Sequence, residues 1–508
     1  MEERIPAVAM RDITKRFGPV VANDKCWLNI YRGEILALLG ENGSGKTTLM
    51  NMLSGVYFPD EGTISIDGKE VLIRSPKDAF DLGIGMIHQH FKLVDVLTAA
   101  ENIVLGLPGR LDLKAASQKI REICALYGFE VDPSQKIYDM SVSQKQTVEI
   151  VKVLYRGADI LILDEPTAVL TPQETEKLFA VLRNMRDAGK AVVIITHKMH
   201  EVEELSDRVA VLRKGQFTGD MLTRNTNAQE MTNMMVGHPV VLNIERPEPV
   251  DPRPRIEVKN LSVRDVEGTL KLDDVSFTAR SGEILGIAGV SGSGQKELLE
   301  AIAGLQKVES GSVSYVNDDG SREELIGKDP LSIQQLGVSL SFVPEDRLGM
   351  GLVANMDLAD NMMLRSFRMG SSLFTDRKTP KTLAEHVVEA LEVNTPGIFT
   401  PVRRLSGGNV QKVLVGREIS NAPTVLLTAY AVRGLDINSS YTIYDLINQQ
   451  KTSGVAVVYV GEDLDVLLEL ADRVLVLCGG KVSGVVDGRS TNKNEVGAMM
   501  TRLGGERA

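Results

Sequence analysis

The chain has few cysteines and no long apolar segment. Cys26, Cys124 and Cys478 are the three cysteines in 508 residues, and their spacing matches neither a CxxC redox pair nor a metal site. We expect them to be reduced side chains in the protein interior. The longest apolar runs, such as residues 191–195, are as long as a strand and far shorter than the roughly 18 residues that cross a bilayer. The sequence therefore predicts no transmembrane segment.

The N-terminus also lacks the apolar core of a secretion signal, because it begins Met-Glu-Glu-Arg. A basic excess is missing as well, since the net charge is -11. This charge argues against general affinity for nucleic acids and against binding to anionic lipids. We therefore expect a cytoplasmic protein that reaches a membrane only through protein partners.

The chain repeats itself. The run RGEIL at residues 32–36 recurs as SGEIL at 281–285, and DRV at 207–209 recurs at 472–474. A chain of 508 residues is too long for one hydrophobic core, and its hydrophobic and charged fractions of 43% and 25% are ordinary for a folded protein. We therefore predict two copies of one domain.

Each copy is expected to be an α/β domain. In the first copy, short apolar runs at 160–163 and 191–196 flank a helix-like segment at about 172–188, and this order favours a mainly parallel sheet. Residues 243–255 contain four prolines among charged residues, which is typical of an extended linker. We predict domains at 1–242 and 256–508, joined by this linker.

A phosphate-binding loop is the strongest motif. Residues 40–48 complete the pattern G-x-x-x-x-G-K-[ST] between an apolar strand-like run and a helix-like segment. In such loops, backbone N–H groups turn toward phosphate oxygens, the lysine reaches the β- and γ-phosphates, and the threonine hydroxyl can bind Mg²⁺. A glycine-rich turn with an incidental lysine is the alternative. The residues expected to bind nucleotide here are Gly40, Asn42, Gly43, Ser44, Gly45, Lys46, Thr47 and Thr48.

Polar residues follow other strands of the first copy. One strand ends in Asp164 and Glu165, which suits Mg²⁺ binding by Asp164 and polarisation of the attacking water by Glu165. His197 follows the next strand and could hydrogen-bond the γ-phosphate, while Gln89 follows another and could contact the γ-phosphate or Mg²⁺. An exposed Asp-Glu turn, a surface histidine and a loop glutamine are the alternatives. Phe17 is either an adenine-stacking residue or a core aromatic.

Together these motifs resemble the nucleotide-binding domain of ABC transporters. Such domains carry an LSGGQ-type signature at a helix start, which completes the ATP site of the opposite domain through a serine hydroxyl and backbone N–H groups. The second copy has LSGGN at residues 405–409, so Ser406, Gly407 and Gly408 are expected in that role, whereas MSVSQ at 140–144 is degraded. The resemblance implies two tandem P-loop ATPase domains, each with a mainly parallel sheet, an antiparallel β subdomain and a helical subdomain.

The second copy lacks the chemistry of the first. Its residues at the equivalent positions are Gln295 for Lys46, Lys296 for Thr47, Glu345 for Gln89, Ala429 for Asp164, Tyr430 for Glu165 and Glu462 for His197. No aromatic residue lies between residues 255 and 276 to stack on adenine. Glu462 would also place a negative charge near phosphate, which Lys296 could partly offset.

Because ABC domains work as head-to-tail pairs, the resemblance implies two unequal composite sites. One combines the P-loop and catalytic residues of the first copy with the second copy's signature and Asp436, in its D-loop, and should hydrolyse ATP with Mg²⁺. The other combines Gln295 and Tyr430 with MSVSQ and Thr171, and should be silent or bind nucleotide without cleaving it. Two departures from the family pattern, the YAV run at 430–432 and Ser143, lie in this second site.

Asymmetric tandem copies with LSGGN and the run PEDR at 344–347 look like the ATPase subunits of carbohydrate and nucleoside importers. The runs GMIHQHFKLV at 85–94 and DEPTAVLTPQE at 164–174 look most like the nucleoside branch, and import of a ribose-, galactose- or xylose-type sugar is the nearest alternative. The family implies a place on the cytoplasmic face of the membrane, an extracytoplasmic binding protein or lipoprotein, and two integral permeases docked around residues 90–97 and 348–355.

Two readings without transport stay open from the sequence. A soluble tandem ABC ATPase that acts on ribosomes usually keeps two intact sites and a long charged linker, whereas this chain has one dismantled site and a short proline-rich linker. A regulatory ATPase would hydrolyse ATP independently of any permease.

Overall fold

The computed structural model describes residues 5–88, 91–108, 112–168, 170–239, 243–265, 267–290, 292–367 and 375–502. Contacts divide the chain into two compact units, Met1–Val241 and Leu242–Ala508, called unit 1 and unit 2 below. Among the described helices, none combines the length and the apolar character needed to cross a membrane.

Unit 1 is built on a six-stranded sheet. Its strands, in spatial order, are β10 (Gln216–Leu222), β9 (Arg208–Arg213), β3 (Glu34–Leu39), β8 (Ala191–Ile195), β7 (Ile160–Asp164) and β6 (Ile84–Ile87). All neighbours pair in parallel except β9 and β10. Strands β3, β7 and β8 are buried at every residue, which explains their uninterrupted apolar sequence. Their register, with Leu38 and Asp164 both opposite Ile195, brings their carboxyl ends to one edge of the sheet.

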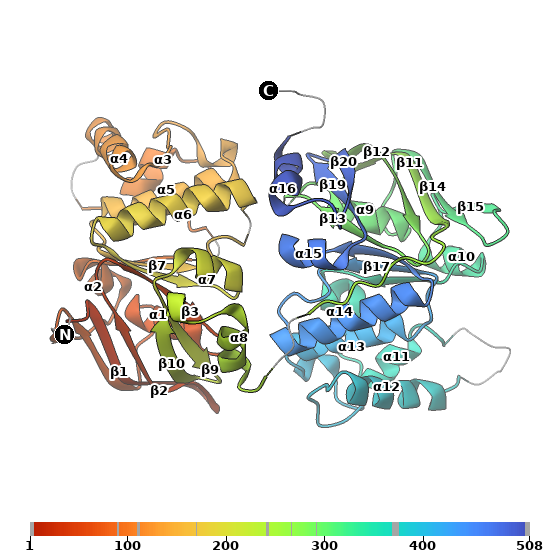
Figure 1. Cartoon of the computed structure of the whole chain (residues 1–508), viewed down its shortest axis with the longest axis horizontal. Helices are drawn as coiled ribbons and strands as arrows, with labels where there is room; N and C mark the ends of the chain where they lie inside the picture. The colour runs from red at the N-terminus through yellow and green to blue at the C-terminus, as the bar shows by residue number, and fades with distance from the viewer. Residues whose placement is uncertain are drawn as a thin grey trace. The chain divides into compact units, whose positions relative to one another are not determined.

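An antiparallel sheet and two groups of helices complete unit 1 (Figure 1). The antiparallel strands, in spatial order, are β2 (Val20–Ile30), β1 (Val8–Phe17), β4 (Glu61–Ile66) and β5 (Lys69–Val71). The helices are α1 (Lys46–Leu53), α2 (Pro76–Asp81), α3 (Ala99–Val104), α4 (Leu113–Tyr127), α5 (Val142–Tyr155), α6 (Pro172–Asp187), α7 (Met199–Leu205) and α8 (Ala228–Val236). Apolar residues of α1 fill the core between the two sheets, and α3, α4 and α5 share a separate small core.

Unit 2 repeats this architecture strand for strand. Its parallel-type sheet contains β16 (Leu340–Val343), β17 (Val425–Ala429), β18 (Ala456–Val460), β13 (Ile284–Ala288), β19 (Arg473–Cys478) and β20 (Lys481–Asp487), and its antiparallel sheet contains β12 (Leu270–Arg280), β11 (Pro254–Arg264), β14 (Ser310–Val316) and β15 (Arg322–Glu324). Both sheets have the spatial order of their counterparts in unit 1. The predicted fold class, a tandem of α/β domains with mainly parallel sheets, is thereby confirmed.

The helices of unit 2 also follow the pattern of unit 1. They are α9 (Gln295–Ile302), α10 (Pro330–Gln335), α11 (Leu358–Met363), α12 (Lys378–Ala390), α13 (Gly407–Ile419), α14 (Ile437–Thr452), α15 (Leu464–Leu470) and α16 (Lys493–Thr501). Helices α11, α12 and α13 pack together on one side of the sheet, as α3, α4 and α5 do in unit 1 (Figure 1).

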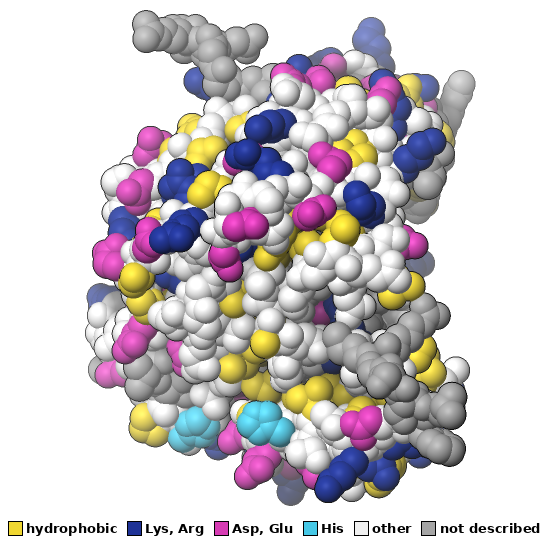
Figure 2. Space-filling model, turned by 90° about the vertical axis from the view of Figure 1, so that its right-hand side faces the viewer, with side chains coloured by type: hydrophobic (Ala, Val, Ile, Leu, Met, Phe, Trp, Pro, Cys, Tyr) yellow, Lys and Arg dark blue, Asp and Glu magenta, His cyan; other side chains and the backbone are white. Residues whose placement is uncertain are grey.

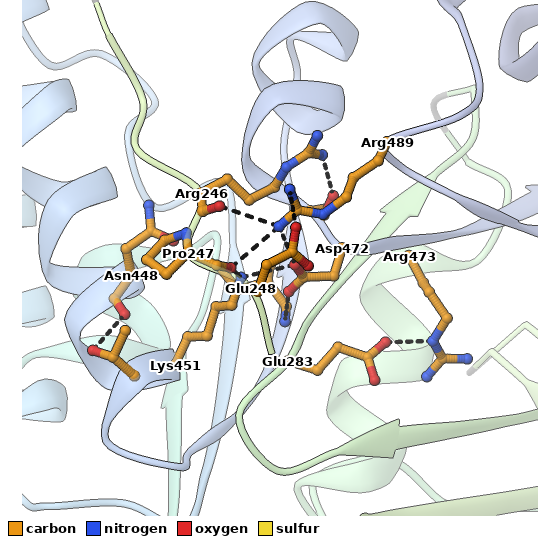
Figure 3. A network of polar contacts seen from close by, with 12 residues as sticks. Arg246, Pro247, Glu248, Glu283, Asn448, Lys451, Asp472, Arg473 and Arg489 are labelled. Atoms are coloured by element: carbon orange, nitrogen blue, oxygen red, sulfur yellow. Dashed lines mark hydrogen bonds and ion pairs between the residues drawn. The ribbon is translucent and has the colours of Figure 1, made fainter. Parts of the chain in front are cut away.

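The proline-rich segment at 243–253 contains neither helix nor strand, and β11 begins at Pro254, inside the stretch predicted as linker. The segment is extended, yet it is fastened to unit 2 (Figure 3). Arg246 donates hydrogen bonds to the carbonyl oxygens of Leu468 and Ala471, both at 2.8 Å. Lys451 donates to the carbonyl oxygen of Pro247 and forms a buried ion pair with Asp472 at 2.7 Å. Composition correctly predicts an extended backbone here, but it does not predict these anchors.

Charge and thiol chemistry agree with the composition. On the face of unit 2 shown in Figure 2, acidic and basic side chains are interspersed, so this face offers little net attraction for a polyanion. Cys26 and Cys124 are buried and Cys478 is half-buried, and all three are free thiols. Burial raises the pKa of each thiol, which keeps these side chains protonated and unreactive.

Candidate functional site

The loop between β3 and α1 is shaped by glycines. Gly45 caps α1 with a φ of 95°, and Gly43 has a φ of 79°, both in the left-handed region that favours glycine. A Cβ atom on Gly40 would lie 2.3 Å from the carbonyl oxygen of Leu212, and one on Gly45 would lie 2.4 Å from that of Ala22. Only glycine fits at these two positions. Asn42 and Gly43 are exposed at the tip of the loop, and Thr48 lies half-buried in the first turn of α1.

The side chain of Lys46 folds back onto this loop. Its side chain is 8% exposed, and its ammonium group donates hydrogen bonds to the carbonyl oxygens of Gly40 at 2.7 Å and Glu41 at 2.9 Å. Burial lowers the pKa of Lys46, while neighbouring carboxylates act in the opposite direction. The hydroxyl of Ser44 is buried and has no hydrogen-bond partner in the described part of the chain. A buried cation and an unsatisfied hydroxyl inside a glycine-rich loop fit a bound phosphate.

Thr47 and Asp164 form the first of two polar pairs at the sheet edge. The Thr47 hydroxyl donates a hydrogen bond to Asp164 Oδ2 at 3.1 Å, which links the start of α1 to the end of β7. Asp164 is 8% exposed, and burial raises the pKa of its carboxyl. Two oxygen ligands brought together in this way fit a hard divalent cation such as Mg²⁺.

Glu165 and His197 form the second pair. His197 Nδ1 lies 3.1 Å from Glu165 Oε1, and this hydrogen bond holds the pKa of Glu165 below its usual value. Glu165 has a φ of 47°, and its backbone N–H donates to the carbonyl oxygen of Ile195 at 2.9 Å. This bend turns the carboxylate away from the strand. An ionised carboxylate held by a histidine can accept a proton from water.

The structure also places the two remaining candidates of unit 1. Phe17, at the end of β1, is 43% exposed and packs edge-on against Tyr57, with 5.2 Å between ring centroids. It is therefore a surface aromatic, which removes the core alternative. Gln89 lies outside the described residues.

In unit 2, the predicted signature starts helix α13. Ser406 is the N-cap: its hydroxyl accepts hydrogen bonds from the backbone N–H of Asn409 at 3.4 Å and from Asn409 Nδ2 at 2.8 Å. The D-loop lies beside it, because a Cβ atom on Gly408 would be 3.7 Å from the carbonyl oxygen of Gly434. Asp436 caps the next helix, α14, by accepting hydrogen bonds from the backbone N–H and the hydroxyl of Ser439.

The degraded signature of unit 1 keeps the helix start without the glycines. Ser141 caps α5 and forms a reciprocal capping box with Gln144. Val142 is exposed and Ser143 half-buried in the first turn. The local fold therefore does not require the glycine pair.

The start of α9 in unit 2 resembles that of α1 but lacks the buried cation. Gly294 has a φ of 98°, close to that of Gly45. Gln295 is buried and donates a hydrogen bond to the carbonyl oxygen of Val290 at 3.2 Å. Tyr430 repeats the bend of Glu165, with a φ of 56° and an N–H bonded to the carbonyl oxygen of Val460 at 2.9 Å.

Arg433 pairs with two carboxylates of this second site. It pairs with Glu345 at 2.5 Å and with Glu462 at 2.9 Å, and its guanidinium lies over the ring of Tyr430. The cation paired with Glu462 is Arg433. Lys296, which could partly offset the same charge, is exposed and lies 3.8 Å from Glu300 on its own helix. An alignment of the two copies could have identified Arg433 as the pairing cation. Arg433 replaces Ala168 in the same copy in which glutamates replace Gln89 and His197.

Comparison with known proteins identifies the family. The model of the ABC transporter family, ABC_tran, matches residues 24–168 and 272–428. The nucleoside import ATP-binding protein NupA of Lactococcus lactis is 42% identical, with 97% of each chain covered. The glucose import ATP-binding protein TsgD13 of Haloferax volcanii is 40% identical, covering 98% of this chain and 96% of its own. The guanosine import ATP-binding protein NupO of Bacillus subtilis is 40% identical, with 97% of each chain covered.

A solved structure shows that the tandem arrangement is known. The crystal structure of the archaeal ribosomal stalk protein aP1 with the ribosome recycling factor aABCE1 matches with a TM-score of 0.64 and 16% identity, covering 96% of this chain and 92% of that chain. At this identity the match concerns the fold alone. The two family matches, the shared sheet order and the full-length relatives lead to one conclusion: this chain belongs to the ABC transporter family, with two domains of that family in tandem.

Proposed function

We propose that the chain is the ATP-hydrolysing subunit of a membrane importer whose cargo is a nucleoside. The observation that carries the ATPase assignment is the pairing of Thr47 with Asp164 and of Glu165 with His197 at the sheet edge that also holds Lys46. Open α/β sheets bind their ligands at this edge, outside the carboxyl ends of the strands.

Each side chain has a distinct role in the proposed reaction. Lys46 exchanges its loop carbonyl partners for the β- and γ-phosphate oxygens of ATP. Thr47 and Asp164 would hold Mg²⁺, which would neutralise charge on the phosphates, and Gln89 would contribute to the same cation or to the γ-phosphate. Glu165 accepts the proton of the attacking water, while His197 orients Glu165 and hydrogen-bonds the γ-phosphate. Phe17, exposed on β1, stacks on adenine.

We propose that hydrolysis occurs at one composite site. The P-loop of unit 1 works with the Ser406, Gly407 and Gly408 signature and with Asp436, as in the head-to-tail pairs of the family. The other site has no cation at position 295, and its carboxylates are already paired with Arg433. One guanidinium against two carboxylates leaves this cluster with a net negative charge that does not attract phosphate, so we expect this site to be silent.

The energy of this cycle is passed to partners. Importers of this family have two permeases and an external solute-binding protein, and we place this subunit on the cytoplasmic side of the membrane. The exposure of apolar side chains in the two stretches predicted as permease contacts supports this proposal. These side chains are Val94 (41%), Val96 (67%), Leu348 (41%), Met350 (44%) and Val353 (42%).

The nucleoside cargo is supported by relatives rather than by the site. Two of the three relatives named above are nucleoside or guanosine import proteins, and the third is a glucose import protein. This subunit does not contact the cargo, so sugar import is the second candidate. It is favoured by the glucose import relative, which is as similar to this chain as the guanosine import relative, at 40% identity.

The test is uptake of labelled uridine, adenosine and ribose by cells that express the chain with its neighbouring permease and binding-protein genes. Wild type is compared with Glu165→Gln, which keeps the shape of the side chain and removes the base. Nucleoside uptake that disappears in Glu165→Gln supports the whole proposal. Ribose uptake alone would assign the sugar branch, and uptake that is indifferent to Glu165 would overturn the ATPase site.

A further inference from the structure

A single arginine of unit 2 joins three functional segments that are far apart in the sequence. Arg347, in the PEDR run after β16, donates one guanidinium hydrogen bond to the carbonyl oxygen of Gly407 at 3.0 Å and another to that of Arg433. Gly407 belongs to the signature, and Arg433 begins the D-loop, three residues before Asp436. The planar fork of arginine can bridge two fixed carbonyls in this way, whereas a lysine ammonium has no comparable geometry.

Glycines lie beside both contacts, because Gly407 supplies the first carbonyl and Gly434 follows Arg433, which supplies the second. A Cβ atom on Gly407 would lie 3.2 Å from Arg347 Nη1, and one on Gly434, where φ is 72°, would lie 3.5 Å from Nη2. The signature and the D-loop therefore close around the guanidinium. In the other copy, Phe91 occupies the position of Arg347 and Val142 that of Gly407, so the copy with the degraded signature has no guanidinium there.

The segment that carries Arg347 is fastened to the signature helix at its other end too. Residues Arg347–Gly351 form a π-helical turn, and the carbonyl oxygen of Gly351 accepts a hydrogen bond from Arg417 Nη2 at 2.7 Å. Arg417 lies on α13 and is buried against the fully buried Glu418. The exposed side chains Leu348 and Met350 lie on this turn. Any force applied to the turn is therefore transmitted to α13.

We propose that Arg347 is a positioning residue, which fixes the signature relative to the D-loop and connects both to the apolar turn. The inference rests on the proposed function, because the signature and Asp436 act on ATP bound by the other unit. Arg347 acts through the backbone of Gly407 and Arg433, whose carbonyl oxygens accept its hydrogen bonds. Its loss leaves the P-loop of unit 1 intact and misplaces the groups that complete the site.

The test is ATP hydrolysis by the full chain assembled with its permeases. Arg347→Ala is expected to lower kcat by about tenfold to a hundredfold, because misplacement of about 1 Å has effects of this size. Arg347→Lys keeps the charge but cannot bridge both carbonyls, so it should recover only part of the loss. The matched control is Arg322→Ala, which removes an exposed arginine on β15 that pairs with Glu257 of β11. This variant should hydrolyse ATP like wild type. The melting temperature of each variant identifies any that fails to fold.

A double-mutant cycle separates positioning from a general structural role. If Arg347 acts through the signature, Arg347→Ala should cost less than about twofold in a chain that already carries Ser406→Ala. Losses that simply multiply would overturn the inference, as would wild-type turnover in Arg347→Ala. If Ser406→Ala hydrolyses ATP slowly, either of these two outcomes refutes only the role of Arg347 and not the proposed function. Wild-type turnover in Ser406→Ala would instead refute the composite site, and the inference with it.

Discussion

Lys46 and Gln295 are the first residues of α1 and α9, each after a glycine in the left-handed region, and both are buried. Their contrast isolates the effect of one charge. We predict that Lys46→Ala abolishes tight ATP binding and lowers hydrolysis by at least about a hundredfold, because the buried ammonium group is lost from the phosphate site. Gln295→Ala should keep most activity. Equilibrium binding of a fluorescent ATP analogue and steady-state ATPase rates measure both, and equal damage by the two substitutions would refute the one-site scheme.

The ionised Asp164 lowers the stability of the protein when no nucleotide is bound. Burial raises its pKa, so its ionisation opposes folding once the pH exceeds the value in the unfolded chain. We predict that Asp164→Asn raises the melting temperature without nucleotide by about 2–4 °C at pH 7, equivalent to about 1 kcal/mol, while hydrolysis is lost. The difference in melting temperature should vanish below about pH 3, where Asp164 is protonated in both states. Scanning calorimetry at several pH values gives the answer, and a variant that melts below wild type at pH 7 would contradict this account.

At this scale, spacing alone predicts much of the site. The loop pattern identifies Lys46 and Thr47, and the parallel sheet brings Asp164, Glu165 and His197 to the same edge because they all follow its strands. Arg347 and Arg433 could not be predicted from a single copy. Their partners are backbone carbonyls and carboxylates that are distant in sequence, so only three-dimensional contacts reveal them.

Among the secondary-structure elements, the N-terminal ends of helices α5 and α13 differ in sequence. Ser406 and Ser141 are both N-caps, each accepting a hydrogen bond from the backbone three residues on, but only Ser406 is followed by the glycine pair. Alanine at either position should cost about 1 kcal/mol of stability through loss of the cap. We predict that only Ser406→Ala lowers ATP hydrolysis, by about tenfold or more, because it also removes a phosphate ligand. Urea unfolding and ATPase assays on the pair measure both effects, and equal loss of activity would show that capping alone explains the result.

Strands and helices were largely predictable because apolar runs of five or six residues alternate with longer amphipathic segments. The linker was predictable only in part. Its prolines favour extended backbone, but its attachment to α14, α15 and the loop after β20 depends on the side chains of Asn448, Arg246 and Arg489, which composition does not distinguish from ordinary surface residues.

For the molecule as a whole, the anchored linker makes residues from 243 onward part of unit 2. Lys451 and Asp472 are 1% and 6% exposed, and Lys451 also holds the carbonyl oxygen of Pro247. We predict that Lys451→Met destabilises unit 2 by about 3 kcal/mol, because it removes the nearer cation of the buried Asp472 carboxylate and leaves Arg489 at 3.6 Å. Lys481→Met, which removes an exposed pair with Asp273, should cost less than about 0.5 kcal/mol.

Hydrogen exchange read by mass spectrometry separates the two units in this experiment. Faster exchange at residues 243–253 and in α14, with unit 1 unchanged, is the expected pattern for Lys451→Met. Acceleration confined to unit 1, or none at all, would show that the linker is not anchored through this lysine.

The strand-end bend described at Glu165 and Tyr430 has a consequence for how such proteins diverge. In both copies a backbone hydrogen bond to the neighbouring strand holds the bend, and the side chain takes no part in that bond. After gene duplication, mutation could therefore replace the carboxylate without unfolding the copy that lost it. The fold of this domain and its catalytic residues can therefore change independently. A domain that no longer hydrolyses ATP can be retained because it completes the site of the other domain.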